Sequence, residues 1–314
     1  MQKQRIIVTG GAGFVGSNLV KMLAEDTNNE IIIIDDLFSG SIKNLRGLNV
    51  EFIEGSVLDT RLLNKYISKD SIVYHLAARN IIASTVEPRK DLETNIEGTF
   101  NVLEAAKSNG AKRVLYTSTS SIYGNPKYLP INEEDSVSFL NFYSVSKFAG
   151  ESYAKVFYDA YNLPITIVRY SNVYGNNQRP ENPYSGVIGR FIDNAIRNTP
   201  LSIHGDGEQT RDFTYVEDAC RATILAAKSD KAVGEVYNIG TGIETSVNLL
   251  AKLITEVTNS SSSIQYIEKR DIDNLRRRVM NVEKMRYQLK FTPQFTLNKG
   301  LKKTIEWQLE SKNK

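Results

Sequence analysis

Three glycines at a fixed spacing lie between a strand-like run and a helix-like run near the start of the chain. The apolar residues 5–9 predict a strand, residues 15–25 predict a helix, and the glycines between them are Gly10, Gly13 and Gly16. Glycine permits a tight turn, close approach of the backbone to a phosphate, and close packing of the helix. Because the helix N-terminus then faces the turn, the sequence predicts an anion site at the edge of an α/β sheet.

Strand-like and helix-like segments alternate over the first half of the chain. The predicted strands are residues 5–9, 31–35, 50–53, 72–76, 113–117 and 165–170. The predicted helices are residues 15–25, 59–67, 94–108 and 143–161. This alternation is typical of a parallel sheet with helices on both faces, which is the doubly wound or Rossmann-like fold.

An acidic pair ends the second predicted strand. Asp35 lies at the distance from the glycine turn at which a carboxylate accepts hydrogen bonds from the adenosine ribose hydroxyls of a dinucleotide. A 2′-phosphate at that place would meet a carboxylate, so the sequence predicts NAD rather than NADP as the cofactor. We interpret the next residue, Asp36, as a solvated loop residue.

The later part of the chain is less regular and predicts a smaller lobe. Polar loops interrupt it, among them residues 176–183 and 260–263. We expect an NAD-binding Rossmann domain over residues 1–169 with a return segment at 213–240. The remaining residues, 170–212 and 241–314, are expected to form a smaller C-terminal substrate-binding lobe.

Tyr143 and Lys147 lie one helical turn apart on a predicted helix. A tyrosine has an ordinary pKa of about 10, so it needs a nearby ammonium and a positive nicotinamide ring to act as a base near neutral pH. Such a pair is common on protein surfaces. Here, however, a hydroxyl-rich cluster, residues 116–124, follows a predicted strand at the sheet edge where ligands of this fold bind.

These motifs together resemble the extended short-chain dehydrogenase/reductase family of nucleotide-sugar epimerases, dehydratases and decarboxylases. The resemblance rests on the glycine turn, the His-Leu-Ala-Ala segment at 75–78, Asn95, the hydroxyl cluster and the Tyr143 to Lys147 pair. It implies that Thr119 holds the sugar hydroxyl, and that Tyr143 removes its proton. Lys147 would lower the tyrosine pKa and bind the nicotinamide ribose, with Asn95 near the cofactor.

The resemblance also assigns a set of cofactor-binding residues. They are Gly10, Gly13, Phe14, Val15, Gly16, Asp35, Ser39, Gly40, Ser56, Val57, Leu76, Ala77, Ala78, Asn95, Tyr143, Lys147, Tyr170 and Val173. One of them departs from the family pattern, because Ser56 stands where the family usually has an aspartate that contacts adenine.

Two serines after the catalytic threonine indicate which reaction to expect. Dehydratases of the family have an Asp-Glu pair where this chain has Ser120 and Ser121. A hydroxyl cannot replace a carboxylate as a general acid or base near neutral pH. The sequence therefore favours a 4-epimerase that oxidises and reduces C4 of a UDP-hexose or UDP-N-acetylhexosamine through a transient 4-keto sugar. A UDP-glucuronate 4-epimerase, a 4,6-dehydratase or decarboxylase, and a non-catalytic NAD-binding sensor remain alternatives.

The resemblance places the UDP-sugar against the second lobe. Its expected contacts are Ser120, Ser121, Asn172, Arg179, Val187, Ile203, His204, Arg211, Arg276 and Arg277. Asn172 would meet a phosphate and Arg211 the diphosphate, with Arg276 or Arg277 as a further phosphate ligand. Residues 183–188 resemble hexose and N-acetylhexosamine 4-epimerases, whereas residues 178–180 resemble uronate epimerases, in which Arg179 would meet a carboxylate.

Composition excludes several other classes of function. The net charge of +3 arises from 39 basic and 36 acidic residues spread along the chain, so no basic stripe indicates nucleic acid. No apolar run approaches the roughly 18 residues that a membrane span needs, and two histidines with one cysteine, Cys220, make a zinc site unexpected. We expect no metal and no membrane partner, and a cytoplasmic protein that forms a homodimer.

Overall fold

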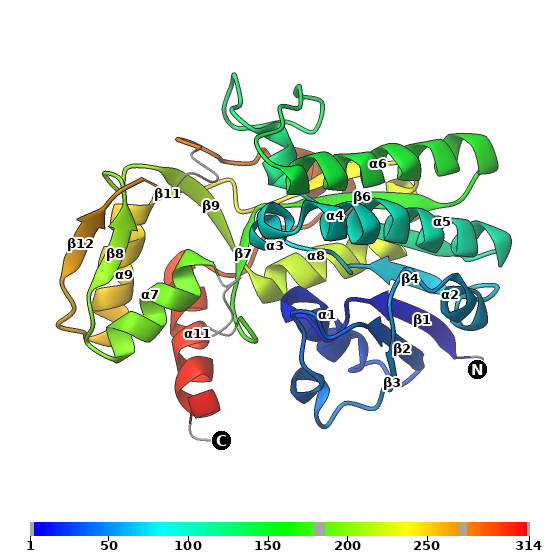
Figure 1. Cartoon of the computed structure of the whole chain (residues 1–314), viewed down its shortest axis with the longest axis horizontal. Coiled ribbons are helices and arrows are strands. Elements are labelled where there is room, and N and C mark those ends of the chain that lie inside the picture. Colours follow the sequence, from blue (N-terminus) through cyan, green and yellow to red (C-terminus); the bar gives the residue numbers. More distant parts are fainter. Residues whose placement is uncertain (1–2, 179–185, 270–274, 313–314) are drawn as a thin grey trace.

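The structure is a computed structural model of the chain, and it describes residues 3–178, 186–269 and 275–312. Its larger part is built on a seven-stranded sheet with the strand order β10-β6-β5-β4-β1-β2-β3, in which all neighbours run parallel (Figure 1). The strands are β1 (Gln4–Thr9), β2 (Asn29–Asp35), β3 (Glu51–Glu54), β4 (Ile72–His75), β5 (Arg113–Thr119), β6 (Ile165–Tyr170) and β10 (Val236–Ile239). The predicted doubly wound fold class is confirmed.

Helices cover both faces of this sheet. On one face α2 (Thr60–Tyr66) packs against α5 (Gly98–Ser108), and α5 packs against α6 (Phe142–Tyr161), which contacts β5. On the other, α1 (Phe14–Leu23) packs against α8 (Val216–Lys228), which contacts β5 and β6. Successive strand residues point to opposite faces, so Ile6 and Val8 enter one core and Ile7 enters the other.

One strand and one helix of this larger part differ from the prediction. β5 runs on to Thr119, so the hydroxyl cluster begins inside the strand, and only the 3₁₀ turn η3 (Ser120–Tyr123) follows it. The helix predicted from residue 94 is instead a run of α3 (Ile81–Val86), α4 (Pro88–Asp91), the π-helical turn η2 (Leu92–Glu97) and α5. Asn80 starts this run, because its side chain accepts hydrogen bonds from the backbone N–H groups of Ile82 and Ala83.

The second lobe contains two small sheets and the helices around them. Its strands are β7 (Asn172–Tyr174), β9 (Thr210–Tyr215) and β11 (Glu244–Ser246) in one sheet, and β8 (Leu201–His204) and β12 (Ile264–Ile267) in the other. Its helices are α7 (Val187–Ile196), α9 (Val247–Thr258) and α11 (Leu297–Lys312). By contrast, α10 (Glu283–Leu289) contacts β10 and the 3₁₀ turn η4 (Asp230–Ala232), and the 3₁₀ turn η1 (Ile42–Leu45) contacts α1, so these three lie with the large sheet. In Figure 1, β8, β12, α7 and α9 lie together, away from the helices of the large sheet.

The chain enters the large sheet again after β9. Within the segment 213–240, α8 packs on the sheet and β10 pairs with β6. The division of the chain into two lobes at the expected residues stays a prediction. In the part of the chain that the structure describes, no helix is both long and apolar enough to cross a membrane.

Candidate functional site

A cavity of about 910 Å³ lies at the carboxyl edge of the large sheet. The strand order turns outward in both directions from the neighbours β1 and β4, and ligands of open α/β sheets bind at such a reversal. The loops after β1, β2, β3 and β4 and the last residues of β5 contribute to the lining. Its volume lies in the upper part of the range for small-molecule and cofactor sites.

The glycine turn forms one wall of this cavity. Gly10 has a φ of +74°, and a Cβ atom there would come within 2.6 Å of the Ala77 backbone nitrogen. A Cβ atom on Gly16 would collide with the carbonyl oxygen of Gly10. Helix α1 begins at Phe14, so its first N–H groups face the turn and favour a bound anion.

Asp35 holds the turn in place from the end of β2. Its carboxylate accepts hydrogen bonds from the backbone N–H groups of Ala12 and Leu37, both at 2.8 Å. Burial raises the pKa of Asp35, while these hydrogen bonds lower it in part. A carboxylate can accept about four hydrogen bonds, so acceptor positions remain for ribose hydroxyls.

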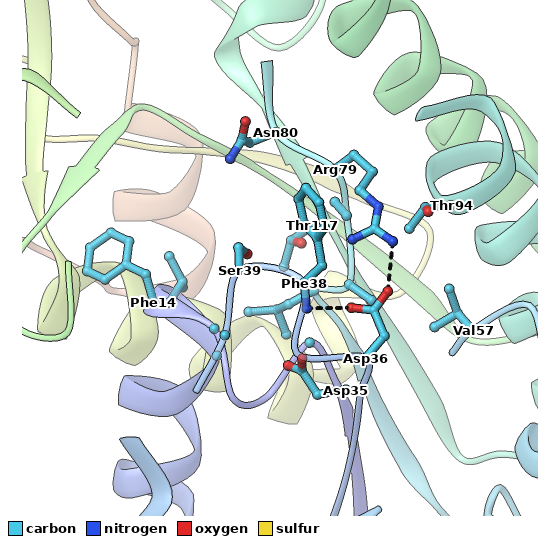
Figure 2. A pocket seen from close by; sticks show the side chains of 18 of the residues that line it. Phe14, Asp35, Asp36, Phe38, Ser39, Val57, Arg79, Asn80, Thr94 and Thr117 are labelled. Carbon is cyan, nitrogen blue, oxygen red and sulfur yellow. Dashed lines mark hydrogen bonds and ion pairs between the residues drawn. The ribbon is translucent and has the colours of Figure 1, made fainter. Parts of the chain in front are cut away.

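Asp36 is an exposed loop residue, as expected, but its side chain also binds its neighbours. Its carboxylate forms a 2.8 Å ion pair with Arg79, and the Arg79 guanidinium lies 3.8 Å from the centroid of the Phe38 ring. Figure 2 shows the loops after β2 and β4 meeting through this pair. Because β1 lies between β2 and β4, the pair reaches across the end of β1.

Almost all the predicted cofactor residues line this one cavity. They are Gly10, Gly13, Phe14, Val15, Gly16, Asp35, Ser39, Gly40, Ser56, Val57, Leu76, Ala77, Ala78, Tyr143, Lys147, Tyr170 and Val173. Asn95 is the exception: it is fully buried, and its amide bonds the backbone N–H and carbonyl of Arg79 at 2.8 and 3.0 Å. Asn95 therefore supports the cavity wall from behind.

Thr119, Tyr143 and Lys147 also meet at the cavity. Helix α6 places the tyrosine in its first turn, because the Asn141 side chain caps the helix by accepting from the Ser144 N–H. The Tyr143 hydroxyl hydrogen-bonds the Thr119 side chain, whose Oγ1 also accepts from the backbone N–H of Ser121 at 3.1 Å. A substrate hydroxyl in the cavity could therefore meet both oxygens.

Burial is the main influence on the pKa values of Tyr143 and Lys147. Burial raises the pKa of Tyr143 to about 12, and the hydrogen bond with Thr119 lowers it only in part. Burial lowers the pKa of Lys147 to about 7, against the carboxylates of Glu151 and Asp91, which raise it. The direction for Tyr143 is opposite to the expected lowering by Lys147. The prediction relied on a bound nicotinamide cation as well, and in the protein alone burial is the largest influence on the pKa of Tyr143.

The residues present fit NAD. The glycine turn and helix α1 suit a pyrophosphate, Asp35 suits ribose hydroxyls, and the apolar Val57 suits a base. In the described part of the chain, three buried polar atoms of residues on the cavity wall, Arg79 Nε, the Ser118 hydroxyl and the Gln178 side-chain oxygen, lack a hydrogen-bond partner. Such atoms are typical of a site that binds a polar ligand.

The expected substrate arginines come together beside β9 but outside this cavity. Arg211 is buried and donates to the carbonyls of Thr210 and Leu275, both at 2.8 Å. The exposed side chains of Arg276 and Arg277 form ion pairs of 2.7 Å with Asp206 and Glu244, respectively. The three arginines thus belong to one neighbourhood of the second lobe.

The remaining expected substrate residues are more scattered. Ile203 lies fully in the core, so its side chain cannot contact the UDP-sugar. His204 is half-buried, and its Nδ1 lies 2.8 Å from the Glu268 carbonyl oxygen. The Asn172 side-chain oxygen is buried and has no partner among the described residues. Ser120 and Ser121 are buried behind the cavity, Val187 packs on the core at the start of α7, and Arg179 lies outside the described residues.

Several cavity residues were not predicted from the sequence. They are Ile34, Asp36, Phe38, Ser41, Asn44, Gly55, Arg79, Asn80, Thr94, Thr117, Ser118, Ser171, Asn177, Gln178 and Gly186. Some had a usable signal: Arg79 directly follows the Ala77-Ala78 pair, and Ser118 lies inside the hydroxyl cluster. Residues such as Asn177 carry no such signal, because only the fold brings them to the cavity.

Comparison with known proteins agrees with this geometry. A sequence model of the NAD dependent epimerase/dehydratase family matches residues 6–240. The chain is 37% identical to a putative UDP-glucose 4-epimerase of Methanocaldococcus jannaschii, covering 96% of this chain and 97% of that protein. It is also 37% identical to a UDP-N-acetyl-alpha-D-glucosaminuronate decarboxylase of Bacillus cytotoxicus, covering 99% of each chain.

The fold comparison gives the same result. The crystal structure of a UDP-glucose 4-epimerase from Thermotoga maritima, with UDP-glucose, superposes with a TM-score of 0.93 at 36% identity, covering 98% of this chain and 99% of that one. The matched family is NAD dependent and other neighbours were solved with NAD, so NAD is the cofactor. The chain is an enzyme of the NAD-dependent epimerase/dehydratase family.

Proposed function

We propose that the chain is a UDP-sugar 4-epimerase that inverts C4 of a UDP-hexose or UDP-N-acetylhexosamine. The observation that carries the proposal is the placement of acidic groups. Among the described residues, the carboxylates that line the cavity are Asp35, which ends β2, and Asp36, which directly follows it. Thr119 and Tyr143 lie at the end of β5 and on α6, with the serines 120 and 121 beside them. Elimination of water needs a carboxyl acid and base at that place.

The residues around the sugar then have separate tasks. Thr119 orients the 4-hydroxyl, and the Tyr143 oxygen, already hydrogen-bonded to Thr119, accepts its proton. Lys147 as an ammonium below the tyrosine favours the phenolate form of Tyr143. Bound NAD supplies the acceptor and donor of the hydride. The resulting 4-keto sugar then rotates to present its opposite face, and Tyr143 returns the proton to the oxygen on the inverted C4.

The pairs of sugars that fit this proposal are UDP-glucose with UDP-galactose and UDP-N-acetylglucosamine with UDP-N-acetylgalactosamine. The similarity to UDP-glucose 4-epimerases supports these substrates. On the protein side, Arg211, Arg276 and Arg277 offer guanidinium groups to the diphosphate. Binding of the diphosphate would require Arg276 and Arg277 to exchange their carboxylate partners for phosphate oxygens.

A panel of sugar nucleotides tests the function. Purified protein is incubated with UDP-glucose, UDP-N-acetylglucosamine, UDP-glucuronate and dTDP-glucose, and the products are separated, weighed by mass spectrometry and assigned by proton NMR. We expect products of unchanged mass inverted at C4 from the first two. A product lighter by water or by carbon dioxide, or turnover of UDP-glucuronate alone, would contradict the proposal.

We further infer that the protein is a homodimer in the cytoplasm. Helix α6 exposes large apolar side chains, with Phe142 and Val156 each 56% exposed and Val145 46% exposed. An exposed apolar helix face is typical of a protein interface, and a second copy of the chain can supply the same face. The only cysteine, Cys220, is buried, which suits a reducing compartment. Light scattering after size exclusion should give twice the mass of 35.3 kDa, and Val145→Glu should give the monomer.

A further inference from the structure

A buried carboxylate lies behind the catalytic residues and outside the cavity. Asp91, the last residue of α4, is 3% exposed. Its Oδ1 accepts hydrogen bonds from the Ser84 hydroxyl at 2.5 Å, the Asn95 amide at 2.6 Å and the Ser146 hydroxyl at 2.9 Å. Among the described residues, no lysine or arginine forms an ion pair with it. Because a buried charge normally has a cationic partner, this arrangement requires an explanation.

The three donors come from different sides of the site. Ser146 belongs to α6, directly before Lys147, and its hydroxyl lies 3.1 Å from the Tyr143 carbonyl oxygen. Asn95 belongs to the π-helical turn η2, and π-turns are frequent at functional sites. The same Asn95 amide holds the backbone of Arg79, which lines the cavity. Asp91 therefore joins the catalytic helix to the loop that forms the cavity wall.

The other carboxylate near Lys147 is held by an arginine. Glu151 lies one turn further along α6, where Arg169 binds it with hydrogen bonds of 3.0 Å from Nε and 2.7 Å from Nη2. Among the described residues, Asp91 has no such cation, and its charge acts on Lys147 together with that of Glu151, which has the larger effect. Asp91 raises the pKa of Lys147 against the effect of burial, and it raises the pKa of Tyr143.

The remaining titratable groups around Lys147 carry no charge near neutral pH. Tyr116 packs its ring 4.3 Å from the Lys147 nitrogen, and burial raises the pKa of Tyr116 well above its ordinary value. His75 is fully buried between the hydroxyls of Thr9 and Thr99, and burial lowers its pKa to about 3. Asp91 and Glu151 are therefore the two anions that influence the lysine, and of these Asp91 is the one without an ion pair to an arginine or lysine among the described residues.

We propose that Asp91 is a positioning residue for the Tyr143 and Lys147 pair. Its carboxylate fixes helix α6 against the cavity wall through Ser146 and Asn95, and together with Glu151 it supplies negative charge that favours the ammonium form of Lys147. The consequence for turnover rests on the proposed function. The effect on Lys147 does not, because it concerns the protein alone.

The test is the variant Asp91→Asn, which keeps the shape and the acceptor oxygen but removes the charge. Glu97→Gln is the matched control, since Glu97 is an exposed carboxylate of the same helical run. Protein labelled with ¹³C at lysine Cε is titrated by NMR, and the Lys147 signal is the one missing from Lys147→Met. We expect Asp91→Asn to lower the Lys147 midpoint by about one pH unit and Glu97→Gln to leave it unchanged. An unchanged midpoint in Asp91→Asn overturns the proposal.

Turnover gives a second readout. In Asp91→Asn, kcat should fall about tenfold while KM for the UDP-sugar changes little, and the pH profile of kcat should move. A rise of KM with constant kcat would contradict a positioning role. If Asp91→Asn does not fold, Ser146→Ala is used, because it removes one hydrogen bond to Asp91 and keeps the Asp91 charge. We then expect kcat to fall while the titration midpoint of Lys147 stays unchanged. An unchanged kcat would count against the proposal. If the wild type turns over no UDP-sugar, the proposed function fails and the titration still decides the role of Asp91.

Discussion

The side-chain nitrogen of Lys147 lies 4.3 Å from the centroid of the Tyr116 ring, in a place where the lysine is only 2% exposed. Attraction to an aromatic face offsets part of the cost of burying a charge, but burial still lowers the lysine pKa from 10.5 to about 7. This shift corresponds to a free energy on the order of a few kcal/mol in the folded protein. Lys147 therefore destabilises the fold when it is charged.

Lys147→Met should stabilise the protein without a cofactor, and the gain should depend on pH. Below pH 7 the lysine is protonated in both folded and unfolded protein, so removing it saves the whole cost of its buried charge. Between pH 7 and 10.5 the folded lysine has lost its proton and the unfolded one has not, so the wild type gains stability as the pH rises. Urea unfolding at pH 6 and pH 9 should show a larger gain at pH 6. An equal gain at both values would mean that Lys147 is not titrating in this window.

Tyr143→Phe should reduce turnover by about 10² to 10⁴-fold, the usual contribution of a general base. The phenyl ring keeps the packing of the first turn of α6, so NAD should remain bound. Tyr153→Phe is the matched control, because Tyr153 lies on the same helix and is 40% exposed. Steady-state rates and the NAD content of both purified variants decide the matter. A Tyr143→Phe enzyme with wild-type turnover would place the base elsewhere.

Asp35 should make NAD bind more tightly than NADP. Two unit charges about 4 Å apart repel by about 1 kcal/mol in water and about 4 kcal/mol near a protein surface, so a 10- to 100-fold preference is expected. Asp35→Asn removes the charge but keeps an acceptor for the Ala12 or Leu37 N–H. This variant should reduce the ratio of the NAD affinity to the NADP affinity. Calorimetric titration of wild type and variant with both cofactors measures it. Equal affinities in the wild type would show that Asp35 does not face the ribose.

The part of the site that the sequence could predict is the part formed by contiguous motifs. The glycine turn, the end of β2 and the Tyr143 to Lys147 pair each depend on local spacing, and the fold brings them to one cavity. The fold class follows from the same local alternation of segments. By contrast, the pairing of Asp36 with Arg79 joins residues 43 positions apart, and neither residue alone signals its partner.

Local spacing in the sequence also could not predict the side-chain directions of Asn95 and Ile203. Asn95 was expected at the cofactor, but the π-turn η2 directs its amide to Asp91 and Arg79 behind the wall. Ile203 was expected to contact the UDP-sugar, but its strand β8 turns that side chain into the core. In both cases the residue lies in the right region, and the direction of its side chain depends on local backbone geometry that spacing does not reveal.

Thr119→Val should separate the role of the threonine hydroxyl from its shape. Valine fills the same space, but it removes the hydrogen bond that lowers the pKa of Tyr143 and the acceptor of the Ser121 N–H. The pKa of Tyr143 should therefore rise further, so a smaller fraction of the tyrosine is ionised at neutral pH. We expect kcat to fall about 10²-fold, and the midpoint of the rise of kcat with pH to move to a higher pH. Thr85→Val is the control, because the exposed Thr85 hydroxyl bonds only the Ile81 carbonyl on α3. A pH–rate profile of each variant measures both effects. If Thr119→Val lost activity equally at every pH, the threonine would orient the sugar without influencing the ionisation of Tyr143.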